Sequence, residues 1–110
     1  FEEERIKTFY LDQLDPFSIA AFFQQVCEQD FQLMIDDGLH TFEAGTTLFT
    51  HSIDHLAESG IYVIEDVLKD DLVNYKMFFD RTDFLVDYVT MFRPNSGLGD
   101  NSLIVIRKNL

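Results

Sequence analysis

Cationic side chains are scarce in this sequence of 110 residues, which has 8 lysines and arginines against 20 aspartates and glutamates, and a formal net charge of −12. Because such a surface repels a phosphate backbone and no basic cluster offsets it, we expect no nucleic-acid partner. The single cysteine excludes an internal disulfide and suits a reducing compartment. No apolar run reaches the ~20 residues that a membrane span needs. These absences predict a cytoplasmic protein without a membrane-spanning segment.

Aromatic residues are abundant, with 12 phenylalanines and 4 tyrosines in a chain whose hydrophobic content is 46%. Each aromatic side chain buries a large area, and a chain of this length has room for one compact domain at most. We therefore expect a globular unit with an aromatic core.

Strand-like and helical patterns alternate along the chain. The predicted strands are 6–11, 31–35, 61–64, 84–92 and 102–107, and the predicted helices begin at Pro16, span 41–58 and span about 69–79. The loop between the last two strands is too short for a crossover helix, so these strands should be antiparallel neighbours. The order predicts an α/β fold with a mainly parallel sheet, helices on both faces and one reversed strand at the end.

Acidic residues follow each of the three predicted parallel strands. Asp12 follows the first, Asp36 and Asp37 follow the second, and Glu65 and Asp66 follow the third. Open parallel sheets bind ligands beyond the carboxyl ends of their strands, so five carboxylates should meet on one rim. There they could serve as helix N-caps and solvated loop ends, or they could bind a cation.

The stretch after the second strand adds an imidazole to this rim. Gly38 allows a sharp turn, so Asp37 and His40 are expected to face one space. Hard oxygen ligands suit Mg²⁺ or a similar ion. Neutral imidazole is well populated near pH 7, so His40 could act as a general base on a metal-polarised hydroxyl.

Two segments of the sequence resemble segments of a known protein family, and the resemblance extends over essentially the whole chain. The run FQLMIDDGLHTFEAGTTLFTHSIDHLAESGIYVIEDV resembles the fourth strand, following helix and fifth strand of class I S-adenosylmethionine-dependent methyltransferases. Within that class it resembles metal-dependent sugar and natural-product O-methyltransferases, which have a DDGxH element and a later strand ending in ED. The run RIKTFYLDQLDP resembles their third strand and its turn. The resemblance makes residues 1–110 the C-terminal half of a Rossmann-like methyltransferase domain, from the third strand to the last.

The resemblance also implies roles for the rim residues. Asp37, Glu65 and Asp66 match the positions that hold the divalent ion, and His40 matches the base that deprotonates the acceptor hydroxyl. Asp36 is expected to be structural. The implied reaction is methyl transfer from S-adenosylmethionine to a hydroxyl of a sugar or a glycosylated small molecule, assisted by Mg²⁺ or a similar cation.

The cofactor site is only partly represented in these residues. Asp12 and the backbone of Gln13 match the place where the family contacts the adenine ring. The glycine-rich loop after the first strand and the acidic residue that grips the ribose have no counterpart here. We therefore expect the 110 residues alone to bind the cofactor poorly and to be inactive. We also expect them to form homo-oligomers, or to contact a partner, through the uncovered sheet edge.

Two other functions remain compatible with the sequence. One is a non-catalytic methyltransferase-like interaction module that retains the fold and the acidic rim. The other is an unrelated metal-dependent α/β hydrolase or transferase that uses the aspartate pair.

Overall fold

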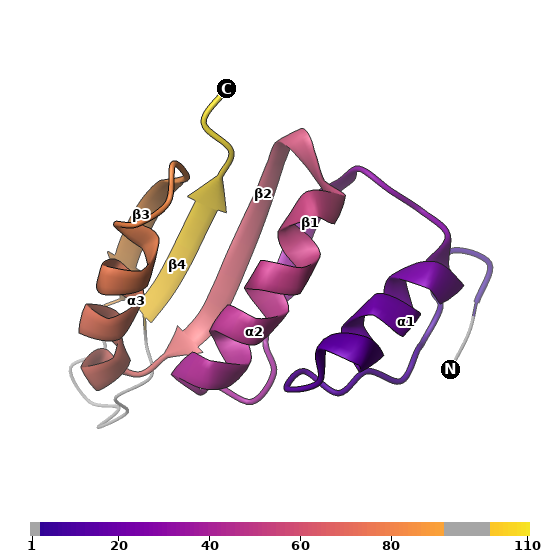
Figure 1. Ribbon diagram of the computed structural model, residues 1–110, viewed down its shortest axis with the longest axis horizontal. Coiled ribbons are helices and arrows are strands. Elements are labelled where there is room, and N and C mark those ends of the chain that lie inside the picture. The colour runs from indigo at the N-terminus through magenta and orange to yellow at the C-terminus, as the bar shows by residue number, and fades with distance from the viewer. Residues whose placement is uncertain (1–2, 92–101) are drawn as a thin grey trace.

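Helices and strands alternate in the computed structural model, which describes residues 3–91 and 102–110 (Figure 1). In chain order the elements are α1 (Pro16–Val26), β1 (Phe31–Asp36), α2 (Phe42–Ser52), the 3-10 turn η1 (Ile53–His55), β2 (Leu56–Val67), the 3-10 turn η2 (Lys69–Asp71), α3 (Leu72–Phe79), β3 (Leu85–Thr90) and β4 (Ser102–Arg107). The predicted loop at 94–101 lies outside the described residues. Among those described, no helix is both long and apolar enough to cross a membrane.

The four strands form one sheet in the order β1-β2-β4-β3. β1 pairs in parallel with β2, whereas β4 pairs antiparallel with both β2 and β3. The predicted antiparallel pairing of the last two strands is therefore confirmed. β1, β2 and β3 point the same way, but β4 lies between β2 and β3 and runs against both. Because only one of the neighbouring pairs is parallel, the predicted mainly parallel sheet is not confirmed.

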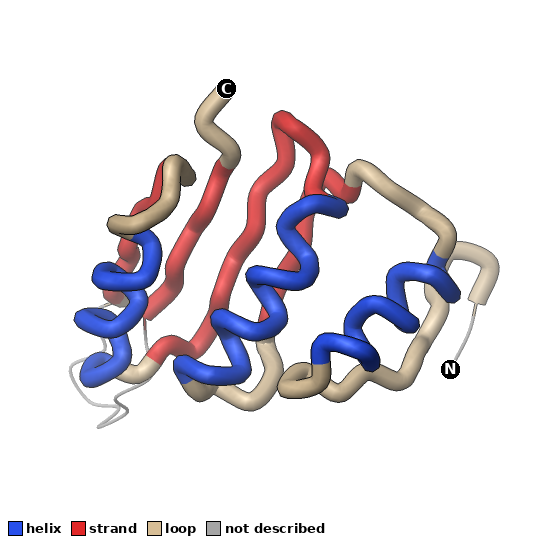
Figure 2. The backbone as a smooth tube through the Cα atoms, in the orientation of Figure 1, coloured by secondary structure: helices blue, strands red, loops and turns tan. Residues whose placement is uncertain are grey.

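Helices α2 and α3 cover one face of the sheet, and α1 lies next to α2, beyond β1 (Figures 1 and 2). The buried core joins Phe49 of α2 and Tyr75 of α3 to alternate residues of β2 and β4 on that face. The prediction of helices on both faces is wrong for the described residues. Right-handed crossovers place helices on the same face as long as successive strands advance in one direction across the sheet. Here β1, β2 and β3 follow one another in one direction across the sheet. A helix would lie on the second face only if a later strand were added in the opposite direction.

The predicted strand at 6–11 is not a strand in the structure. The only backbone pairing in the described part of that region is an isolated bridge between Glu3 and Ile6. Phe9 packs edge-on against Phe22 of α1, with the ring centroids 5.5 Å apart. A strand is defined by the neighbour that accepts its hydrogen bonds, and among the described residues none lies alongside this stretch.

Local signals place the helix starts correctly. Asp15 caps α1 by accepting a hydrogen bond from the Phe17 N–H, and Thr41 caps α2 by accepting one from the Ala44 N–H. The predicted helix 41–58 ends earlier than expected, because α2 stops at Ser52 and β2 already begins at Leu56. Leu56 is buried, and an apolar residue there fits a helix and a buried strand equally well.

The core is aromatic, as the composition predicts. The Phe49 ring is 2% exposed and meets the rings of Tyr62, Phe79 and Phe84 edge to face, with centroids 5.1 to 5.3 Å apart. Ile104 of β4 is fully buried in the same cluster. The last strand of the chain therefore contributes to the centre of the fold.

Candidate active site

The candidate site lies where β1 and β2 end on the same edge of the sheet. Their parallel register pairs Asp36 with Ile64, so the residues that follow on each strand, Asp37 and the pair Glu65 and Asp66, arrive at neighbouring positions. Ligands bind at this carboxyl edge in open α/β sheets.

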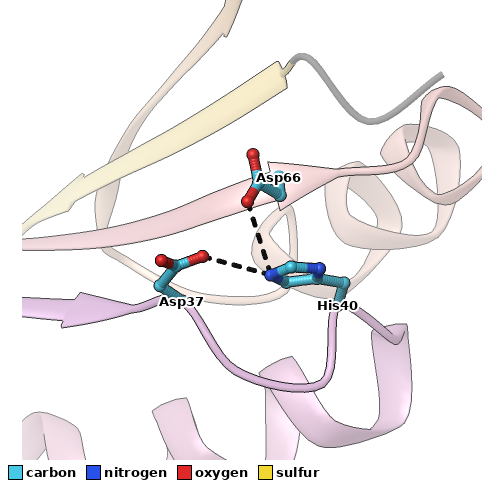
Figure 3. A group of neighbouring side chains, drawn as sticks. All are labelled: Asp37, His40 and Asp66. Atoms are coloured by element: carbon cyan, nitrogen blue, oxygen red, sulfur yellow. Dashed lines mark hydrogen bonds and ion pairs between the residues drawn. The ribbon is translucent and has the colours of Figure 1, made fainter. Parts of the chain in front are cut away.

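Asp37, His40 and Asp66 point toward one another at this edge (Figure 3). His40 Nε2 lies 3.1 Å from Asp37 Oδ1 and 3.5 Å from Asp66 Oδ2. One ligand atom from each residue lies within 4.8 Å of the others. The three side chains are 35%, 57% and 45% exposed for His40, Asp37 and Asp66, so a ligand in solution can reach them. Two carboxylates and an imidazole at this spacing can hold a divalent cation.

Unusual backbone geometry orients two of these side chains. His40 and Asp66 both adopt left-handed conformations, with φ of 58° and 53°. Asp66 also lies where the pairing of β2 with β4 shifts register between Ile64 and Val67, and such bulges redirect side chains next to functional sites. Left-handed backbone is uncommon for residues other than glycine, although aspartate and histidine tolerate it better than most.

The Asp36 carboxylate is hydrogen-bonded to the loop that carries Asp37 and His40. It is not one of the three residues whose ligand atoms meet. Its carboxylate accepts two hydrogen bonds from Gln13 Nε2, at 2.9 and 2.8 Å, and a third from the Gly38 N–H at 3.1 Å. Burial raises the pKa of the Asp36 carboxyl, and the hydrogen bonds from Gly38 and Gln13 act in the opposite direction. Gln13 Oε1 accepts a hydrogen bond from the Leu39 N–H at 3.1 Å. Gln13 thus ties the Asp37–His40 loop to the start of α1.

Gly38 serves this network through its missing side chain. A Cβ at this position would collide with the side-chain amide oxygen of Gln13. The sequence suggests a sharp turn at Gly38, but the left-handed residue of this loop is His40. The glycine is required because another side chain approaches closely.

The Gln13→Ala variant is expected to lower the free energy of unfolding by roughly 1–3 kcal/mol, because it removes the Gln13 hydrogen bonds to the buried Asp36 carboxylate and leaves the Leu39 N–H without its acceptor. Urea unfolding followed by circular dichroism measures the change. Gln25→Ala, at an exposed position on α1, is the matched control and should be nearly neutral. An equal decrease in the free energy of unfolding of the two variants would contradict the proposal that Gln13 stabilises the Asp37–His40 loop.

The remaining predicted residues do not belong to the group. Glu65 lines a small pocket together with His40 and Asp66, but it is not among the three residues whose ligand atoms meet. Asp12 is exposed, and its carboxylate accepts a hydrogen bond from the Leu14 N–H at 3.0 Å. The Gln13 side chain is engaged with Asp36 and Leu39, which the sequence did not indicate.

Tyr75 lines the same pocket from α3 and was not predicted as a site residue. Its hydroxyl donates a hydrogen bond to the Thr41 carbonyl at 3.3 Å, and a Cβ on Gly45 would collide with that hydroxyl. Burial, with the negative charges of Asp36 and Asp71 nearby, raises the pKa of Tyr75 far above its usual value. No local signal could reveal the contact, because 34 residues separate Tyr75 from Thr41.

The chain is similar to known methyltransferases in sequence and in structure. No protein-family model matches the chain. A stretch of 66 residues, 60% of the chain, is 38% identical to demethylmacrocin O-methyltransferase from Streptomyces fradiae. The solved structure of MycE, a methyltransferase from the mycinamycin biosynthetic pathway in complex with Mg and SAH, superposes on 97% of this chain with a TM-score of 0.63 and 21% identity.

The chain has a methyltransferase fold. The resemblance to methyltransferases found in the sequence is confirmed by these two comparisons. This methyltransferase fold is partial, because the chain spans 16% of the length of the curated relative and 34% of the MycE chain.

Proposed function

We propose that this chain is part of an S-adenosylmethionine-dependent O-methyltransferase that acts on a hydroxyl of a sugar or a glycosylated small molecule. The observation that carries the proposal is the meeting of Asp37, His40 and Asp66 beyond the ends of two parallel strands in a methyltransferase fold. The name of the curated relative, an O-methyltransferase, supports oxygen as the atom that is methylated. The bound Mg and SAH of MycE support the metal and the cofactor.

The proposed metal ligands are Asp37, Asp66 and Glu65. The first two carboxylates and the imidazole lie close enough to share one ion, and Glu65 lines the adjoining pocket. The acidic residues around this pocket also include Asp36 and Asp71, and their negative charge favours a cation there. A bound divalent ion supplies Lewis-acid chemistry that lowers the pKa of a coordinated hydroxyl.

His40 is the proposed general base. Its Nε2 contacts the Asp37 carboxylate. Its backbone, immediately before α2, is left-handed. Neutral imidazole takes the proton from the acceptor hydroxyl, and the oxygen then forms its bond to the methyl carbon as the carbon–sulfur bond of the sulfonium donor breaks. Positioning of the two reactants supplies much of the rate.

Asp12 and the backbone of Gln13 are the proposed contacts of the adenine ring. Asp12 is exposed. Gln13 is hydrogen-bonded to the buried Asp36, which directly precedes the proposed metal ligand Asp37. This arrangement would place the cofactor on the side of the site nearest the start of α1. The whole enzyme is proposed to act on a small-molecule or glycan acceptor and to be a homo-oligomer.

Calorimetry with S-adenosylhomocysteine, with and without Mg²⁺, tests the proposed function. We expect binding by a protein that joins this chain to the rest of a methyltransferase fold, and weak or no binding by the 110 residues alone. A hydrolase that uses Asp37, His40 and Asp66 to bind a metal should release no heat with S-adenosylhomocysteine, either as the joined protein or as the 110 residues alone. Binding without any methyl transfer to glycosylated acceptors would favour a non-catalytic interaction module.

A further inference from the structure

The backbone on each side of His40 is hydrogen-bonded to a side chain from a distant part of the chain. The Leu39 N–H donates to Gln13 Oε1 at 3.1 Å, and the Thr41 carbonyl accepts a hydrogen bond from the Tyr75 hydroxyl at 3.3 Å. Gln13 is 26 residues from Leu39 in sequence, and Tyr75 is 34 residues from Thr41. The backbone around His40 is therefore held by residues outside its own loop.

A glycine makes room for each of these two side chains. A Cβ at Gly38 would collide with the side-chain amide oxygen of Gln13, and a Cβ at Gly45 would collide with the Tyr75 hydroxyl. Gly45 lies inside α2, where glycine is less favourable than alanine. The Tyr75 hydroxyl occupies the space that an alanine methyl group would fill, so the glycine is matched to this contact.

Tyr75 is itself packed tightly. It is 3% exposed, and its ring meets that of Phe42 edge to face with the centroids 5.0 Å apart. Its hydroxyl reaches the first turn of α2, where the Thr41 carbonyl also accepts the Gly45 N–H at 2.9 Å. Thr41 is the N-cap of α2 and directly follows His40. A displacement of Tyr75 would thus be transmitted to the start of α2 and to His40.

We infer that Tyr75 is a positioning residue, which holds the Thr41 carbonyl and thereby fixes the backbone that carries His40. Figure 3 shows the imidazole of His40 directed toward Asp37 and Asp66. Its Nε2 lies 3.1 Å from the first carboxylate and 3.5 Å from the second, and a small movement of the backbone would change both distances. The inference rests on the proposed function for the role of His40, whereas the contact of Tyr75 with α2 can be tested without any reaction.

The Tyr75→Phe variant removes the hydroxyl alone. In a protein that joins this chain to the rest of a methyltransferase fold, we expect kcat to fall roughly tenfold or more, because a displacement of about 1 Å can slow a reaction about 100-fold. The KM for S-adenosylmethionine and the affinity for Mn²⁺ should change little. Tyr62→Phe is the matched control and should leave kcat unchanged, because Tyr62 is 2% exposed in the same core but lines a different cavity, next to α1.

Amide hydrogen exchange tests the contact in the same protein without cofactor or acceptor. Tyr75→Phe should speed exchange of the Gly45 N–H in the first turn of α2 severalfold. Exchange of the Ile104 N–H in the buried strand β4 should not change, because local opening affects only the segment that has lost its contacts. In Tyr62→Phe, exchange of the Gly45 N–H should stay as it is in the unaltered protein.

Gly45→Ala provides an independent variant. Its methyl group would displace the Tyr75 hydroxyl from Thr41, so kcat should fall about as far as in Tyr75→Phe. The double variant should be no slower than Tyr75→Phe alone, because phenylalanine has no hydroxyl to displace and residues in contact give non-additive effects.

Three results would overturn the inference. These are an unchanged rate of Gly45 exchange in Tyr75→Phe, an equal loss of kcat in Tyr75→Phe and Tyr62→Phe, and effects of Gly45→Ala and Tyr75→Phe that multiply in the double variant. A protein that methylates no acceptor, but whose Gly45 N–H exchanges faster in Tyr75→Phe, would count against the proposed function alone.

Discussion

The His40→Asn variant is expected to lower the rate of methyl transfer by roughly 10²- to 10⁴-fold, the usual contribution of a general base. Asparagine is chosen because it tolerates the left-handed backbone that His40 adopts, so the loop before α2 should keep its shape. The assay uses a protein that joins this chain to the rest of a methyltransferase fold. Affinity for S-adenosylhomocysteine and the free energy of unfolding should change little, because the His40 side chain is 35% exposed.

His51→Asn is the matched control for this prediction. His51 is exposed on α2 and belongs to no group around the site, so its replacement should leave turnover unchanged. Partial recovery of the His40→Asn enzyme by added imidazole would support a role in proton transfer. Full turnover in the His40→Asn enzyme would rule out the base assignment.

Loss of either aspartate of the group is expected to weaken divalent-metal binding by roughly 10- to 100-fold or more, since even residues that only support metal ligands have effects of that size. Asp37→Asn and Asp66→Asn remove one charge each without changing shape, and asparagine again suits the left-handed backbone at position 66. Mn²⁺ is a suitable probe, with affinity measured by calorimetry or electron paramagnetic resonance. Removing the metal with a chelator should abolish transfer, and restoring it should recover the activity.

The same titration separates the two roles open to His40. If His40 is a base that does not bind the ion, the His40→Asn variant should keep nearly the same Mn²⁺ affinity. If His40 is a third metal ligand, the same variant should lose affinity. Glu65→Gln shows whether Glu65 completes the ligand set, and Asp54→Asn, at an exposed position in η1, controls for the general loss of negative charge. Equal affinity in the Asp37→Asn, Asp66→Asn and Asp54→Asn variants would contradict the metal site.

The parts of the fold that were predictable from sequence depend on local signals. An aspartate followed by proline locates the start of α1, and the two apolar runs that end in acidic pairs locate β1 and β2. The meeting of Asp37, His40 and Asp66 followed from one long-range rule, that parallel strands end at the same edge. Residues 6–11 were predicted to form a strand because their composition suits one, but pairing depends on a neighbour that composition does not reveal.

Other features of the site required coordinates. Nothing near Gln13 in the sequence indicates that its side chain bonds to Asp36, 23 residues away. The left-handed conformations of His40 and Asp66 were also not predicted, because only a few per cent of residues other than glycine adopt them. The face on which each helix lies depends on the order of strands across the sheet, which hydrophobic periodicity does not contain.

The position of β4 has a consequence for the way the protein assembles during synthesis. Ile104 and Ile106, both fully buried, belong to the strand that separates β2 from β3. While the ribosome still holds these residues, β2 and β3 have no common neighbour, and the phenylalanines of α2 and α3 and Tyr75 of α3 lack part of their packing surface. The interior can therefore close only after β4 has left the ribosome, and until then chaperones have an exposed aromatic surface to recognise.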